Sequence, residues 1–161
     1  MIASIDPGVS GAIAWLADNG ELCSVEDLPM NEVKVGKTVR KRLAGAALAR
    51  MLIDNRPVHV FLEEVATRPG EGAVGAFSFG RGFGTIEGIL AALAIPYTLV
   101  RPDVWKRGMQ MPAKGDKGVS RTRAMQCFPS HATRFARVKD DGRAEAALIG
   151  SWGIGIMGRM A

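Results

Sequence analysis

The sequence predicts an α/β fold in which a mixed five-stranded sheet is flanked by helices. Short apolar runs separated by turn residues fill the first 28 positions, which predicts an antiparallel meander of three strands. After that point, apolar β-branched runs alternate with helical patterns, as in parallel strands joined by helical crossovers. The chain has 161 residues, no internal repeat and no linker-like stretch. We therefore expect a single domain spanning residues 1–161.

The opening meander is marked by its turns. Asp6-Pro7-Gly8 follows the first apolar run, and Asp18-Asn19-Gly20 contains an Asn-Gly pair, which is a strong hairpin signal. Residues 29–37 are polar and contain glycine, so we expect a loop there. The three strands are expected at 2–6, 12–16 and 22–28.

The remainder of the chain alternates between helical and strand patterns. Apolar residues recur at helical spacing from 39 to 54, and the β-branched run that follows predicts a strand parallel to the first. Residues 66–83 are rich in glycine with little periodicity, which predicts a long flexible loop. Ser120 is a candidate N-cap, and the last helix is expected to begin at Asp140 or Asp141. The expected strands are 58–62 and 96–100, and the expected helices are 39–54, 84–93, 102–107, 120–128 and 142–157.

The charge balance favours a polyanionic partner. The formal net charge is +5 with a sequence pI near 9.6, and basic residues gather in 34–42, 101–117 and 121–139. Such residues can displace counterions from nucleic-acid phosphates. No apolar run is long enough for a membrane span and no signal peptide is recognisable, so we expect a cytoplasmic protein with no membrane partner. Cys23 and Cys127 have no metal-ligand spacing and are expected to pack as apolar residues.

Four acidic residues stand at the ends of predicted elements. Asp6 and Glu63 each follow a buried strand, and a helical crossover would bring these two strand ends to the same sheet edge. Asp141 and Glu145 are four residues apart and so share one face of the last helix. Glu64 should point to the opposite face of its strand, because side chains alternate. A cluster of carboxylates repels itself, and Mg²⁺ or Mn²⁺ would stabilise it.

These motifs together resemble the RuvC-type Holliday junction resolvases of the RNase H-like superfamily, especially their small phage-encoded relatives. Weaker matches are Ser78-Phe79-Gly80, Arg101-Pro102 with Trp105-Lys106, and Lys117 with Ser120. The matches occur in family order and span residues 5 to 149, which is nearly the whole chain. The strongest matches are Ile5-Asp6-Pro7-Gly8 with Gly11, Phe61-Leu62-Glu63-Glu64-Val65, and the run from Asp141 to Leu148.

The resemblance implies an RNase H-like fold and a homodimeric, structure-selective endodeoxyribonuclease. Its substrate would be branched DNA, above all four-way junctions, cut by paired nicks in a bacterial or phage-infected cell. Two Mg²⁺ ions would bind Asp6, Glu63, Asp141 and Glu145, with Mn²⁺ also supporting activity. The family spaces its last two acids by three residues, so either Asp140 or Asp141 could be the ligand. Lys117 would assist catalysis, and the implied DNA contacts are Arg68, Phe77, Phe79, Arg81, Lys106, Lys114 and Lys117.

Three alternatives remain compatible with parts of this pattern. The acids could be helix caps and strand-end residues of a non-catalytic protein that binds branched DNA. An actin-like ATPase also opens with an acid before a glycine hairpin, but it needs a second phosphate hairpin and a much longer chain. A nuclease of the same fold could instead act on RNA–DNA hybrids or on replication forks.

Overall fold

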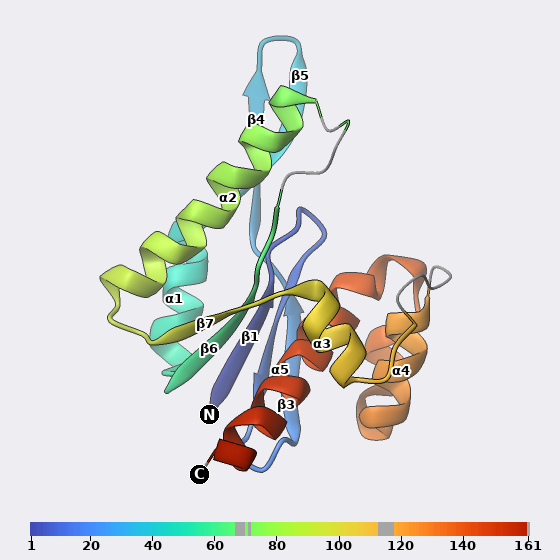
Figure 1. The fold of residues 1–161 in the computed structure, drawn as a ribbon. Helices are drawn as coiled ribbons and strands as arrows, with labels where there is room; N and C mark the ends of the chain where they lie inside the picture. Colours follow the sequence, from blue (N-terminus) through green and yellow to red (C-terminus); the bar gives the residue numbers. More distant parts are fainter. Residues whose placement is uncertain (67–69, 71, 113–117, 161) are drawn as a thin grey trace.

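The central element is a five-stranded mixed sheet with the strand order β3-β2-β1-β6-β7. The computed structural model describes residues 1–66, 70, 72–112 and 118–160. Strand β1 pairs antiparallel with β2 and parallel with β6, so the predicted mixed sheet is confirmed (Figure 1). Its strands are β1 (Ile2–Asp6), β2 (Ala12–Leu16), β3 (Leu22–Asp27), β6 (His59–Glu63) and β7 (Tyr97–Val100).

Helices cover both faces of this sheet (Figure 1). On β1, Ala3 and Ile5 pack in the core with α1 and α2, whereas Ile2 lies in the core that contains α5. Ser4 also faces α5, because its hydroxyl donates to the carbonyl of Ala146 at 2.7 Å. This alternation of side chains places Asp6 on the α5 face. The helices are α1 (Gly45–Asn55), α2 (Ala73–Ala92), α3 (Pro102–Gly108), α4 (Val119–Cys127) and α5 (Asp141–Met160), with 3₁₀ helices at Pro129–Phe135 and Val138–Asp140.

A second, two-stranded sheet was not predicted. Strands β4 (Met30–Val35) and β5 (Thr38–Leu43) form an antiparallel ribbon that extends away from the main sheet beside α2 (Figure 1). The expected loop at 29–37 and the expected helix start at residue 39 are therefore wrong. A tight turn at Gly36, with φ of 61°, joins the two strands. Because the ribbon is mostly exposed, it carries little of the apolar alternation by which a strand is recognised.

Helix α2 is longer than the sequence indicated. It begins at Ala73 instead of residue 84, so the flexible loop expected over 66–83 is wrong for its second half. Glycines lower helix propensity by about 1 kcal/mol each. Here burial outweighs that cost, because Ile86 and Leu90 are fully buried and Phe83 packs against the same core.

Helix α5 lies close against the sheet because glycines face it. A β-carbon at Gly150 would contact the hydroxyl of Ser4 and the side chain of Leu16. The helix continues to Met160, three residues beyond the predicted end. Gly150 and Gly153 therefore allow the close packing of this helix against the sheet. None of the helices in the described residues is long and apolar enough to cross a membrane.

We expect Gly142→Ala to destabilise the protein by about 1 to 3 kcal/mol, because a β-carbon there would overlap the carbonyl oxygen of Ser10. It would also lie 3.0 Å from Oδ2 of Asp6. The matched control is Gly155→Ala in the same helix, where a β-carbon meets nothing within 4 Å. Helix propensity predicts a gain of up to about 1 kcal/mol there. Urea denaturation measures both, and equal stability of the two variants would contradict close packing at Gly142.

Candidate active site

Asp6 and Glu63 stand at the carboxyl ends of the two central strands. The parallel register that aligns Ile5 with Leu62 brings Asp6 and Glu63 side by side. Glu63 is 8% exposed, whereas Glu64 is exposed. Phe61, two positions before Glu63, packs in the α5 core. Because side chains alternate along β6, Glu63 points to the same face as Asp6. Between the two adjacent glutamates, the structure thus places Glu63 beside Asp6.

Asp6 is a partly buried carboxylate held at the start of a tight turn. The backbone N–H of Gly8 donates to its Oδ1 at 3.3 Å, and Gly11 N–H closes the turn on the carbonyl of Gly8 at 2.9 Å. Burial, together with the negative charges of Glu63 and Glu145, raises the pKa of Asp6 to about 7. The Gly8 hydrogen bond and the charge of Lys106 act in the opposite direction. The ionised form of Asp6 is therefore destabilised, because the charge of Lys106 does not offset burial and the two nearby negative charges.

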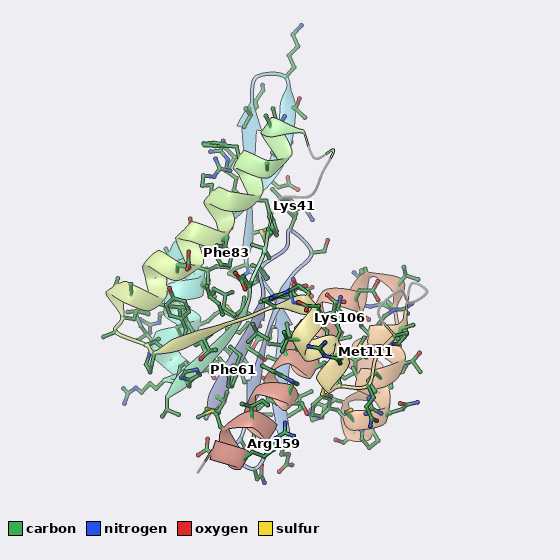
Figure 2. The ribbon with its side chains drawn as sticks, in the orientation of Figure 1. Lys41, Phe61, Phe83, Lys106, Met111 and Arg159 are labelled. Atoms are coloured by element: carbon green, nitrogen blue, oxygen red, sulfur yellow. The ribbon has the colours of Figure 1, made fainter. Side chains whose placement is uncertain are left out.

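Helices α3, α4 and α5 supply the remaining polar groups. The indole N–H of Trp105 donates to Oε1 of Glu63 at 2.9 Å. Glu145 accepts a hydrogen bond from the Ser120 hydroxyl at 2.9 Å and pairs with the ammonium of Lys106 at 3.1 Å. Figure 2 shows Lys106 on α3, where that helix approaches the end of the central strands. Helix α3 thus supplies a donor to each glutamate, and α4 supplies a second donor to Glu145.

The two aspartates at the start of α5 have different surroundings. Asp141 accepts a hydrogen bond from Nε of Arg121 at 2.7 Å, and its side chain is 45% exposed. Asp140 is 1% exposed and is bound by Arg137 at 2.9 Å. Arg143 lies 3.8 Å from Asp140 and also pairs with Asp27. Asp140 therefore belongs to a network of ion pairs that fastens α5 to β3, which leaves Asp141 as the more accessible acid.

The carboxylate oxygens of Asp6, Glu63 and Glu145 are ligands of the kind that divalent cations prefer. Among the described residues, no three acidic, histidine or cysteine side chains are close enough together to hold a metal ion in this conformation. The structure nevertheless places Asp6 in the electrostatic field of Glu63 and Glu145, and hard cations prefer carboxylate oxygens. Lys106 supplies part of the positive charge that such a cation would supply.

The other predicted site residues are distributed unevenly. Phe77 and Phe79 lie on α2 and not on a loop, with Phe77 72% exposed and Phe79 half-buried. Arg81 lies on the same helix. Lys106, predicted as a DNA contact, is paired with Glu145 in this structure. Three further predicted residues, Arg68, Lys114 and Lys117, lie outside the described residues.

Sequence reasoning missed three side chains that contact the acids. Trp105 matched the family only weakly, and its bond to Glu63 was not predicted. Ser120 is predicted as a helix cap, yet the residue before α4 is Gly118, with φ of 106°, and Ser120 donates to Glu145. Arg121, which binds Asp141, carried no signal apart from its place in a basic segment. Hydrogen-bond donors from distant segments have no fixed spacing from their acceptors, so a single sequence does not reveal them.

Comparison with solved structures identifies the same fold in RuvC. The chain is similar to T. thermophilus RuvC in complex with a Holliday junction substrate, with a TM-score of 0.66 and 16% identity over 99% of this chain and 96% of that one. A second Thermus thermophilus RuvC structure matches with a TM-score of 0.56 and 18% identity, covering 99% and 95% of the two chains. No protein-family model and no curated protein matches the sequence. The predicted resemblance is thus confirmed at the level of the fold, and this chain folds as RuvC does.

Proposed function

We propose that this protein is a metal-dependent endodeoxyribonuclease that resolves four-way DNA junctions by paired nicks. The observation that carries the proposal is the partly buried Asp6, which lies beside Glu63 and within the electrostatic field of Glu145 at the strand ends of a RuvC-like fold. A carboxylate whose pKa is raised to about 7 by burial and like charges is a common mark of a functional site. The RuvC structure with a Holliday junction supports the choice of substrate.

The acidic residues would hold two Mg²⁺ ions, with Mn²⁺ as an effective substitute. Asp6, Glu63 and Glu145 would be ligands together with Asp141. Bound divalent cations would activate the attacking water and neutralise charge on the phosphate. Around them, Trp105 fixes the orientation of Glu63, and Ser120 does the same for Glu145.

Basic side chains would stabilise the reacting phosphate and hold the DNA. Lys106 is positioned by Glu145 and carries a positive charge into the site, where it can neutralise phosphate oxygens. Lys117 is proposed for a similar role. Arg68, Arg81 and Lys114 would contact phosphates, while Phe77 or Phe79 would stack on an unpaired base.

We also propose that the working enzyme is a homodimer in the cytoplasm. A junction is resolved by cutting two strands of like polarity, and two related active sites suit that task. The exposed apolar side chains of Val74 and Phe77 on α2 are available for a partner or for DNA.

The decisive experiment is cleavage of labelled four-way junction, fork, linear duplex and RNA–DNA hybrid by the wild-type protein in Mg²⁺, Mn²⁺ or EDTA. We expect paired, symmetric nicks in the junction with either metal and none in EDTA. Cleavage that persists in EDTA, or junction binding without cleavage in any metal, would refute the proposed activity. Cleavage confined to the hybrid would keep the nuclease and replace the substrate.

A further inference from the structure

A groove lies between the β4–β5 ribbon and helix α2, beside the turn that follows Asp6. Its volume is about 210 Å³, and the described residues that line it include no acid. The β1–β2 turn forms one wall, β5 of the ribbon the second and α2 the third (Figure 1). Figure 2 shows Lys41 at the base of the ribbon, near α2. The polar and aromatic part of the lining is Gly8, Lys41, Arg42, Ser78, Phe79, Arg81 and Thr85.

The cations of this groove form no ion pair within the described residues, although Glu32 lies opposite Lys41 in the ribbon. Within the part of the chain that the structure describes, Lys41, Arg42 and Arg81 form no ion pair. By contrast, Arg121 and Arg143 near the proposed acidic site are each paired with an aspartate. Three uncompensated positive charges around one groove favour an anion there.

Arg42 provides a second, independent observation. Its Nε is buried and has no hydrogen-bond partner among the described residues. A buried donor without an acceptor costs free energy, and the cost is larger when the donor is charged. The remaining N–H groups of this guanidinium, which lines the groove, suit phosphate oxygens in particular.

The groove opens at the proposed catalytic site. Gly8 lines it, and the backbone N–H of the same residue donates to the carboxylate of Asp6. A chain of phosphates that follows the groove would therefore pass along the turn that holds Asp6. Lys34 and Lys37 lie towards or at the tip of the ribbon, and neither residue lines the groove.

We propose that this groove binds the phosphate backbone of the DNA strand that is cut, with Lys41 and Arg42 of the ribbon as phosphate contacts. The inference rests on the proposed nuclease function and assigns a substrate-binding role to the ribbon. Arg81 faces the same phosphates from α2, and Phe79 and Ser78 complete the wall. The ribbon thus holds the strand beside Asp6 without taking part in the chemistry.

The test compares two double variants that each remove two positive charges. Lys41→Gln/Arg42→Gln alters the groove, and Lys34→Gln/Lys37→Gln alters the exposed outer part of the same ribbon. Binding to a labelled four-way junction is measured in EDTA at several salt concentrations. We expect the groove variant to bind about tenfold more weakly and to reduce the salt dependence by roughly two phosphate contacts. The outer variant should change affinity by less than about threefold.

The outcomes separate this inference from the proposed function. If the wild type cuts junctions and both variants bind alike, the groove assignment is wrong and the nuclease stands. If the wild type binds but never cuts, the nuclease proposal fails, while the binding comparison still decides the groove. A wild type that binds no DNA overturns both. Lys41→Gln alone, at an exposed position, checks that weaker binding is not caused by misfolding, and it should weaken binding by about threefold with an unchanged melting temperature.

Discussion

We expect Asp6→Asn to lower the rate of junction cleavage by about 100- to 1,000-fold, because charge stabilisation at such a site is worth several kcal/mol. Asparagine keeps the size of the side chain but removes the negative charge beside Glu63 and Glu145. Binding of the junction should stay within about twofold, since Asp6 is partly buried and no cation of the groove is altered. Single-turnover cleavage in Mg²⁺ and binding in EDTA measure the two effects separately.

The two adjacent glutamates offer a matched control for this experiment. Glu63→Gln should reduce cleavage as Asp6→Asn does, because Glu63 lies beside Asp6 and is held by Trp105. Glu64→Gln changes an exposed side chain on the opposite face of β6 and should cleave within about twofold of the wild type. Near-normal cleavage by Asp6→Asn, or equal losses in both glutamine variants, would contradict the assigned site.

The second large effect is a loss of stability at high pH in the metal-free protein. The pKa of Asp6 is about 7 in the folded state, compared with an ordinary value of 3.8. Between these values the folded state binds more protons than the unfolded state, so the free energy of unfolding falls as the pH rises. From about pH 5 to about pH 8 we expect Asp6 to cost roughly 2 to 3 kcal/mol. Urea denaturation in EDTA at both pH values measures this loss.

Asp6→Asn isolates the contribution of this one carboxylate. The variant should lose less stability over the same pH interval, and at about pH 8 it should be more stable than the metal-free wild type. Mg²⁺ should then raise the melting temperature of the wild type at high pH and have little effect on the variant, because a ligand stabilises the state that binds it. A wild type and a variant with the same pH profile would show that Asp6 titrates normally.

Much of the central fold follows from local patterns in the sequence. The apolar runs and the turns at Pro7-Gly8 and Asn19-Gly20 predicted the meander, and the structure has the same three strands. The position of Asp6 and Glu63 at strand ends follows from the same patterns. A helical crossover between parallel strands is almost always right-handed, which makes the neighbouring strand ends predictable as well.

Exposed and glycine-rich elements were harder to predict. The β4–β5 ribbon and the first half of α2 bury little apolar surface, so their residues lack the periodicity that marks a strand or a helix. Both elements form because they pack against other parts of the chain, as Phe83 and Leu43 do beside the α1–α2 core. Consequently the groove between the ribbon and α2 was not predicted either.

Local sequence patterns were enough to predict the five-stranded sheet, with acids at its strand ends and on its last helix. Which of these acids come together became clear only from the folded structure. Glu63 and not Glu64 lies beside Asp6, and Asp140 forms an ion pair with Arg137. It also decided that Lys106 and Ser120 hold Glu145. The physical reason is that local order depends on residues near in sequence, whereas burial, charge pairing and pKa shifts depend on groups that only the complete fold brings into contact.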